Sequence, residues 1–259
     1  MKYLSEQIVT WLKDYAITNN RKAFVLGVSG GVDSALVSAL CAKTGLPTHL
    51  MILPCQTKAN ETELGEMHIK WLTDRYRNVR RHKFDLTSTF EAFAAECKAV
   101  GPETRMESPL GFANSKSRLR MITLYQLATT VGGLVVGTGN KVEDGGVRFF
   151  TKYGDGGVDI SPIGDLMKSE VRQMCREMGI LPELSEAIST DGLWNDTRTD
   201  ESQLGATYDE LEWAMKWRYA TVESPSFLTN RQREILAVYD KWNKAGAHKM
   251  APIPTFVRS

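Results

Sequence analysis

Short runs of apolar and β-branched residues alternate along the chain with longer stretches in which apolar residues recur at helical spacing. The short runs predict strands at Ala23–Val28, His49–Leu53, Val79–Phe84 and Leu134–Gly137. The longer stretches predict helices over Val32–Lys43, Thr62–Tyr76, Thr87–Glu96, Ser115–Thr130, Lys168–Met178, Tyr208–Tyr219 and Arg231–Ala245. Strands separated by helices predict a Rossmann-like α/β fold: a single domain with a mostly parallel sheet and helices on both faces.

The first residues of the chain also have a helical pattern. Apolar and aromatic side chains recur among charged ones, at Leu4, Ile8, Trp11, Leu12 and Tyr15, which predicts an amphipathic helix rather than a signal peptide. No apolar run in the sequence reaches the roughly 18 residues that a membrane-spanning helix needs. We therefore expect a cytoplasmic protein without a membrane partner.

Three polar or glycine-rich segments do not fit the alternation of strands and helices. They cover about residues 100–113, 138–157 and 185–205. Long segments of this kind inside a domain are typically binding loops or lids, so we expect them to contact substrate.

Composition narrows the class of partner. The chain of 259 residues is 42% hydrophobic and 24% charged, with a net charge of +1, so nothing indicates binding to nucleic acid. A local basic cluster (Arg75, Arg77, Arg80, Arg81 and Lys83) is interpreted as a solvated helix end and strand start. The four cysteines are far apart and form no CxxC pair, which indicates free thiols rather than a metal site.

The turn after the first predicted strand indicates chemistry. It reads GVSGGVDS and comprises Gly27, Val28, Ser29, Gly30, Gly31, Val32, Asp33 and Ser34. Glycines at the turn between a strand and a helix let backbone N–H groups and the positive end of the helix dipole point to one place. This arrangement suits phosphate binding. No lysine follows as in a Walker loop, and Asp33 is instead suited to hold Mg²⁺. A plain strand-to-helix turn is the alternative.

The same eight residues resemble the SGGxDS loop of the ATP pyrophosphatase superfamily, whose fold is the adenine nucleotide alpha-hydrolase type. Further segments resemble ammonia-dependent NAD synthetase over nearly the whole chain: NSKSRLRM (114–121), GTGNKVED (137–144), FFTKYGDGGVDISPIGDLMK (149–168), TDESQLGATYDELE (199–212) and HKMAPIPTF (248–256). The resemblance implies the last step of NAD biosynthesis. The nicotinate carboxylate of deamido-NAD is adenylated by ATP with release of pyrophosphate, and ammonia then displaces AMP.

The resemblance also implies roles for individual residues. Residues 27–34 would hold the ATP phosphates, Asp33 and Glu143 would ligate Mg²⁺, and Lys168 would neutralise phosphate charge. Asp33, Glu143 and Lys168 are thus the expected catalytic residues. The hydroxyls of Thr138 and Thr190 would contact ATP, although the neighbours of Thr190 depart from the usual family pattern.

Five further residues match positions at which the family binds deamido-NAD: Arg118, Lys152, Asp159, His248 and Lys249. Cationic side chains suit its pyrophosphate or carboxylate. Four of the candidate residues also have a structural alternative: Arg118 suits the exposed face of a helix, Glu143 a solvated loop, Lys168 a surface position at a helix start and His248 a chain end.

Alternatives at the level of function remain. The chain has no room for a glutaminase domain beside the synthetase core, so we expect free ammonia as the direct nitrogen donor, with ammonia from a separate glutaminase subunit as the alternative. The family resemblance implies a homodimer. A tRNA-thiolating enzyme of the same superfamily is disfavoured by the charge balance and the missing CxxC pairs. A nucleotide sensor without turnover is disfavoured because it would not need two metal ligands and a phosphate cation together.

Overall fold

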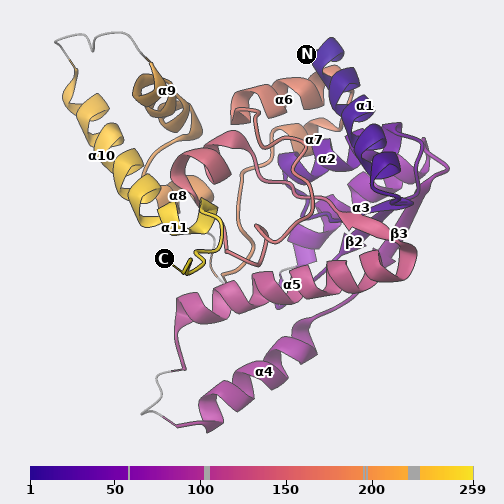
Figure 1. Cartoon of the computed structure of the whole chain (residues 1–259), viewed down its shortest axis with the longest axis horizontal. Coiled ribbons are helices and arrows are strands. Elements are labelled where there is room, and N and C mark those ends of the chain that lie inside the picture. Colours follow the sequence, from indigo (N-terminus) through magenta and orange to yellow (C-terminus); the bar gives the residue numbers. More distant parts are fainter. Residues whose placement is uncertain (58, 102–105, 195, 197, 221–227, 259) are drawn as a thin grey trace.

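Four short strands lie side by side in the computed structural model, which describes residues 1–57, 59–101, 106–194, 196, 198–220 and 228–258 (Figure 1). The strands are β1 (Ala23–Gly27), β2 (Thr48–Ile52), β3 (Val79–Lys83) and β4 (Gly133–Val135), in the order β3-β2-β1-β4. All three pairings are parallel, and an isolated parallel bridge joins Val136 to Ile160. The four predicted strands and the parallel sheet are therefore confirmed.

Helices connect the strands and continue after them. They are α1 (Lys2–Thr18), α2 (Val32–Lys43), α3 (Ala59–Thr73), α4 (Thr87–Ala99), α5 (Pro109–Val131), the π-helix η2 (Lys141–Val147), α6 (Lys168–Glu177), α7 (Pro182–Ser185), α8 (Asp200–Leu204), α9 (Tyr208–Tyr219), α10 (Asn230–Ala245) and α11 (Ala247–Met250). All the predicted helices are present. None of the helices in the described ranges is long and apolar enough to cross a bilayer.

The two faces of the sheet are covered by different helices. Phe24 of β1 and Leu50 of β2 pack into a cluster with residues of α1, α2 and α6. Val25 and Met51, the next residue on each strand, point to the opposite face and pack with residues of α4 and α5. Successive strand residues point to opposite faces, so a strand buried on both sides reads as an unbroken apolar run. Helices on both faces are thereby confirmed.

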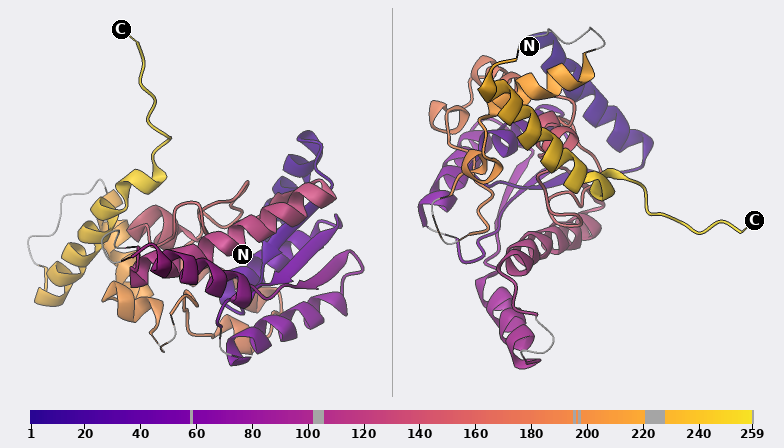
Figure 2. Two further views of the ribbon diagram at one scale, coloured as in Figure 1. Left: turned by 90° about the horizontal axis from the view of Figure 1, so that it is seen from below. Right: turned by 90° about the vertical axis from the view of Figure 1, so that its left-hand side faces the viewer.

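A separate hydrophobic cluster lies beyond the end of the sheet. It is formed by residues of η2, α8, α9 and α10, with Leu211, Ile235 and Tyr239 among the buried members. Figures 1 and 2 show α9 and α10 at the end of the molecule opposite β3. Trp213 and Trp217 pack against this cluster, with ring centroids 5.5 Å apart.

The three predicted loops contain more helix than expected. Helix α5 begins at Pro109 rather than Ser115, because Ser108 caps it by accepting a hydrogen bond from the N–H of Gly111 and proline fits the first turn. Residues 102–105 of the same segment lie outside the described part. The second segment contains η2, and the third contains α8.

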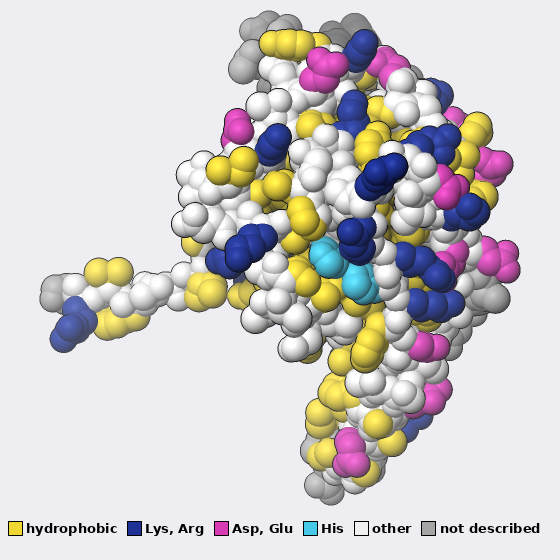
Figure 3. All heavy atoms as spheres, turned by 90° about the vertical axis from the view of Figure 1, so that its right-hand side faces the viewer, with side chains coloured by type: hydrophobic (Ala, Val, Ile, Leu, Met, Phe, Trp, Pro, Cys, Tyr) yellow, Lys and Arg dark blue, Asp and Glu magenta, His cyan; other side chains and the backbone are white. Residues whose placement is uncertain are grey.

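The basic cluster is engaged locally. Arg81 and Lys83 form ion pairs with Glu66 of α3, and Arg75 lies over the ring of Trp71 at 4.3 Å. Figure 3 shows that basic and acidic side chains are interspersed over this side of the molecule. All four cysteines are buried and free, as the sequence predicts.

Candidate active site

The turn between β1 and α2 is held by its own hydroxyl groups. The N–H of Gly31 donates to Ser29 Oγ at 3.2 Å, and Ser34 Oγ donates to the carbonyl of Gly31 at 3.0 Å. Gly30 has φ of 89°, a left-handed conformation that favours glycine. No side chain caps the start of α2, whose first residue is Val32. Its first N–H groups therefore remain available to an anion.

Lys168 is a buried cation between two carboxylates. Its Nζ lies 2.5 Å from Asp33 Oδ2 and 3.0 Å from Glu143 Oε1, and its side chain is only 1% exposed. It is the first residue of α6, where the helix dipole disfavours a cation, so the two carboxylates must compensate. The structure therefore brings together Asp33 of α2, Glu143 of η2 and Lys168 of α6, the three residues predicted to be catalytic.

The ionisation of this cluster follows from its burial and charges. Burial raises the pKa of Asp33 above its usual value, although Lys168 opposes the rise. Burial acts on Glu143 in the same direction, but the charge of Lys168 and hydrogen bonds from neighbouring groups outweigh it and lower the pKa. Burial opposes the charge of Lys168 itself, but the two carboxylates hold its pKa above the usual value. Lys168 therefore stays charged.

Asn140 connects the two acidic residues. Its side-chain oxygen accepts hydrogen bonds from the N–H groups of Val142 and Glu143, and so caps η2. Its Nδ2 donates to Asp33 Oδ1 at 3.2 Å. The fully buried side chain of Asn140 thus caps the start of η2 and also holds the Asp33 carboxylate that pairs with Lys168. Irregular helical turns of this kind are common at functional sites.

Tyr208 and Glu212 of α9 complete the surroundings of Lys168. Tyr208 Oη donates to Glu143 Oε1 at 2.5 Å, and Lys168 Nζ lies 4.6 Å from the centre of the Tyr208 ring. The carboxylate of Glu212 accepts hydrogen bonds from the N–H and Oγ of Ser169, both at 2.7 Å. Helix α9 therefore supports Glu143 and holds the start of α6, which carries Lys168.

Four of the five residues predicted to bind deamido-NAD lie around one stretch of chain. Arg118 Nε donates to the carbonyl of Lys152 at 3.3 Å, and Lys152 Nζ donates to the carbonyl of His248 at 3.2 Å. Lys249 Nζ donates to the carbonyl of Phe150 at 2.6 Å. The ring of His248 is exposed. Lys249 has its pKa lowered by burial, which nearby carboxylates oppose.

Asp159, the fifth residue, is bound to other groups. Its Oδ2 accepts a hydrogen bond from the N–H of Val135 in β4 at 2.8 Å, and its Oδ1 accepts one from Tyr125 Oη at 3.0 Å. Burial and the charge of Asp159 raise the pKa of Tyr125 to about 12. Asp159 thus links the end of β4 to α5.

The two threonines predicted to contact ATP lie on different segments. Thr138 follows β4 and is half-buried, whereas Thr190 is exposed in the third segment. The residues next to Thr190 are held by α8: the N–H of Asp200 donates to the carbonyl of Ser189 at 3.0 Å, and Gln203 Nε2 donates to Asp191 Oδ2 at 3.1 Å.

Sequence reasoning assigned no role to Asn140 or Tyr208. Asn140 lies in the quoted segment GTGNKVED, where an Asx residue before a helical turn is a recognisable capping signal. Tyr208 lies between Thr207 and Glu210, whose spacing indicates a capping box. That pattern locates the start of α9, but only the packing of α9 reveals that the hydroxyl of Tyr208 reaches Glu143.

The fold and the cluster together define the class. A parallel sheet has its first strand followed by a glycine turn, an uncapped helix start and a buried lysine between carboxylates. This arrangement is typical of an α/β protein that binds nucleotide phosphates at the carboxyl ends of its strands.

Comparison with known proteins identifies the family. The family model described as NAD synthase matches residues 4–252. An NH(3)-dependent NAD(+) synthetase of Carboxydothermus hydrogenoformans is 34% identical over 231 residues, which are 89% of this chain and 91% of the relative. Among solved structures, an NMN synthetase from Francisella tularensis has a TM-score of 0.84 at 29% identity and covers 98% of both chains. An NH3-dependent NAD synthetase from Campylobacter jejuni has a TM-score of 0.78 at 21% identity and covers 99% of both chains.

The chain belongs to the NAD synthase family. Its activity is that of an NH3-dependent NAD⁺ synthetase, an ATP-using ligase that forms an amide. The fold class and the function predicted from the sequence are thereby confirmed.

Proposed function

We propose that Asp33, Glu143 and Lys168 form the centre at which ATP is cleaved between its α- and β-phosphates. The observation that carries the proposal is the position of Lys168 Nζ, buried between two carboxylates that belong to the phosphate turn and to η2. One lysine and two carboxylates leave a net negative charge at the cluster. A divalent cation that accompanies the triphosphate would balance that charge.

Mg²⁺ fits the residues that are present. Asp33 and Glu143 offer only oxygen donors, and their side chains are each 16% exposed, so solvent and substrate still reach them. Mg²⁺ is usually bound by one or two carboxylates together with waters and substrate phosphates. Asp33 and Glu143 would hold the ion, which would supply positive charge to the phosphate oxygens.

In this reaction the residues of the protein position the substrates and neutralise charge rather than act as nucleophiles. Residues 27–34 hold the phosphates, with the uncapped N–H groups at the start of α2 as donors, and Lys168 balances charge on the departing pyrophosphate. A carboxylate oxygen of the nicotinate group forms a bond to the α-phosphorus, and the bond to the bridging oxygen of the β-phosphate breaks. Ammonia then attacks the activated carbonyl carbon, loses a proton and expels AMP. Thr138 and Thr190 are proposed to contact ATP through their hydroxyls.

The second substrate is proposed to bind near Arg118, Lys152, His248 and Lys249. Their mutual contacts place several cations around residues 148–152, which suits the phosphates of a nucleotide. For Asp159 we propose an indirect contribution, because its carboxylate is already bound to β4 and α5. Segments 100–113, 138–157 and 185–205 are proposed to line the substrates.

Pyrophosphate release from Mg·ATP by the purified protein tests these roles. We expect release that requires deamido-NAD, with NAD⁺ formed only when ammonium is present. Asp33→Asn should abolish release, whereas Asp165→Asn is the matched control because the Asp165 side chain is 94% exposed. Full activity of Asp33→Asn would refute the proposed centre.

A mononucleotide is a second candidate substrate. The observation that favours it is the similarity to the Francisella tularensis NMN synthetase, at 29% identity and a TM-score of 0.84. The corresponding reaction would amidate nicotinate mononucleotide at the same cluster. Competition between equal concentrations of nicotinate mononucleotide and deamido-NAD, with both amide products quantified, measures the ratio of the two specificity constants and so decides which substrate is preferred.

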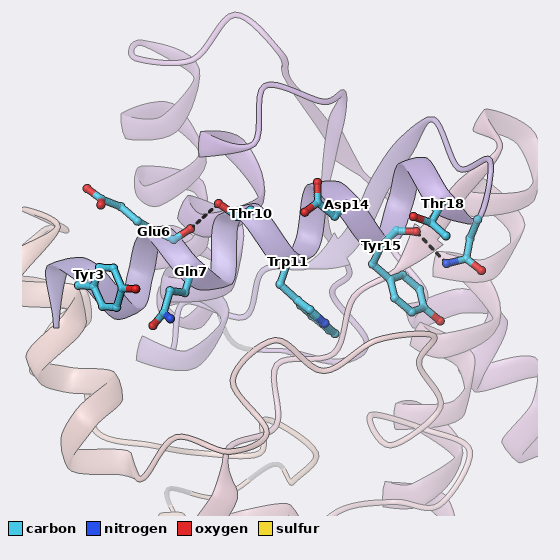
Figure 4. Close-up of a pocket in the computed structure, with 9 residues that line it drawn as sticks. Tyr3, Glu6, Gln7, Thr10, Trp11, Asp14, Tyr15 and Thr18 are labelled. Atoms are coloured by element: carbon cyan, nitrogen blue, oxygen red, sulfur yellow. Dashed lines mark hydrogen bonds between the residues drawn. The ribbon is translucent and has the colours of Figure 1, made fainter.

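A homodimer is proposed as well, supported by apolar side chains that the described chain leaves exposed. Trp11 and Tyr15 lie along a groove on the outer face of α1 (Figure 4), and Ile122 of α5 is 57% exposed. Light scattering coupled to gel filtration gives the mass in solution. Trp11→Lys and Ile122→Lys then test the two helices separately, because a charge introduced at a real interface should yield a monomer.

The cytoplasmic location stays a prediction.

A further inference from the structure

The hydroxyl of Tyr208 lies between two carboxyl groups. Its Oη is 2.5 Å from Glu143 Oε1 and 3.3 Å from Asp200 Oδ2. A phenol carries one proton and can donate only one hydrogen bond of full strength. The shorter contact shows that this proton points to Glu143. The contact with Asp200 is therefore favourable only if Asp200 is the donor.

The surroundings of Asp200 favour the same conclusion. The residue is 6% exposed, and Oδ1 is buried without a hydrogen-bond partner among the described residues. A charged carboxylate in that position would leave a buried oxygen unpaired, which costs far more than burial of a neutral acid. Burial, with the charges of Glu143 and Asp191 adding to it, raises the pKa of Asp200 to about 7, although Lys168 and the contact with Tyr208 oppose the rise.

We propose that Asp200 is a neutral carboxylic acid that donates its proton to Tyr208 and so directs the proton of Tyr208 to Glu143. Asp200 acts through Tyr208 and is a positioning residue rather than a catalytic one. The effect expected on turnover rests on the role proposed for Glu143, whereas the protonation of Asp200 does not.

The hydrogen-bond chain also connects the third segment to the cluster around Lys168. Asp200 is the first residue of α8, and its N–H binds the carbonyl of Ser189, next to Thr190. At the other end of this series of hydrogen bonds, Tyr208 contacts the carboxylate of Glu143, which pairs with Lys168. The placement of the segment that carries Thr190 and the orientation of Glu143 are thus set by one series of contacts.

Kinetics test the positioning role. A neutral hydrogen bond contributes about 1 kcal/mol, which corresponds to roughly a fivefold change in rate. We expect Asp200→Leu to lower the kcat for pyrophosphate release about fivefold, with the KM for ATP nearly unchanged. Asp200→Asn keeps an N–H donor and should retain most of the wild-type rate. In a Tyr208→Phe background, Asp200→Leu should have no further effect because the acceptor is gone.

Infrared spectroscopy tests the proton itself and needs no turnover. At about pH 6, below the pKa of about 7, the wild-type spectrum minus that of Asp200→Asn should contain the C=O band of a protonated acid. Asp209→Asn is the matched control because Asp209 is exposed at the start of α9, and its difference spectrum should show carboxylate bands only.

Two results would overturn the proposal. One is a carboxylate signal for Asp200 at that pH, and the other is a wild-type kcat for a folded Asp200→Leu variant. If the wild-type protein released no pyrophosphate from ATP with deamido-NAD or with nicotinate mononucleotide, the proposed function would fail. The infrared band would still decide whether Asp200 is protonated. If Asp200→Leu did not fold, Asp200→Asn and the infrared band would carry the test.

Discussion

Replacement of Lys168 by methionine removes the one cation that lies between Asp33 and Glu143 in the described cluster, while it keeps most of the side-chain volume. The Lys168 side chain is 1% exposed, and the carboxylates are 16% exposed each. Removal of one partner from a buried ion pair costs about 3–5 kcal/mol. Partial access of water to the carboxylates favours the lower end, so we expect a loss of about 3 kcal/mol.

For a domain of this size, that loss lowers the melting temperature by roughly 6–12 °C. Thermal unfolding in EDTA measures it without interference from divalent cations. Pyrophosphate release should fall by about two to three orders of magnitude in the same variant, because the proposed cation for the leaving group is absent. Asp33→Asn added to Lys168→Met should restore much of the stability, since it removes one of the two unpaired charges.

Lys141→Met is the matched control. Lys141 pairs with Asp165 at 2.7 Å, but the Asp165 side chain is 94% exposed, and exposed ion pairs contribute only about 0–1 kcal/mol. The reasoning would be refuted if Lys168→Met melted within about 2 °C of the wild type, roughly the shift expected of the control. It would also be refuted if Lys168→Met and Lys141→Met were equally destabilised.

Three further predictions concern other sites. Gly139→Ala places a Cβ 1.8 Å from Asp144 Oδ2, so we expect a loss of about 1–3 kcal/mol in denaturant unfolding that Asp144→Ala largely relieves. The pKa of His68 is lowered by burial to about 4 from 6.5, so the unfolded chain gains a proton first. The stability that the wild type has over a folded His68→Gln variant should therefore fall by up to about 3 kcal/mol between pH 6.5 and 4. The hydrogen bonds from Arg231, opposed by burial, lower the pKa of Glu210 to about 2 from 4.5, so Glu210→Gln should cost about 1 kcal/mol at pH 7 and nothing near pH 2. A stability difference between the wild type and His68→Gln that stays constant from pH 6.5 to 4 would contradict the second, and an undiminished Glu210→Gln effect near pH 2 the third.

The framework of the fold could be predicted from the sequence because the buried strands and amphipathic helices have clear periodic patterns. The strand predictions at Ala23–Val28 and His49–Leu53 match β1 and β2, which are largely buried, to within one residue at each end. The pattern fails where no apolar period exists. The π-helix η2 has the sequence KVEDGGV, and it forms because Asn140 caps it and its buried valines pack between α9 and α10.

Some residues of the candidate site could likewise be predicted from the sequence, and others could not. Asp33, Glu143 and Lys168 could be predicted because they lie in motifs that resemble a known family. Tyr208 could not, because its contact with Glu143 depends on how α9 packs, and no local pattern encodes that. Asp159 also lies in such a motif, and its contact with deamido-NAD stays a prediction; the hydrogen bonds of its carboxylate to Val135 and Tyr125 could not be read from the motif.

Tyr208 belongs to two parts of the molecule at once. Its ring is a buried member of the hydrophobic cluster formed by η2, α8, α9 and α10, and its hydroxyl reaches the carboxylate beside Lys168. A loosening of that cluster would therefore move the hydrogen bond between Tyr208 and Glu143 before it exposed the sheet to solvent. For this enzyme, the packing among the C-terminal helices should therefore affect turnover as well as stability, because the same tyrosine contributes to both.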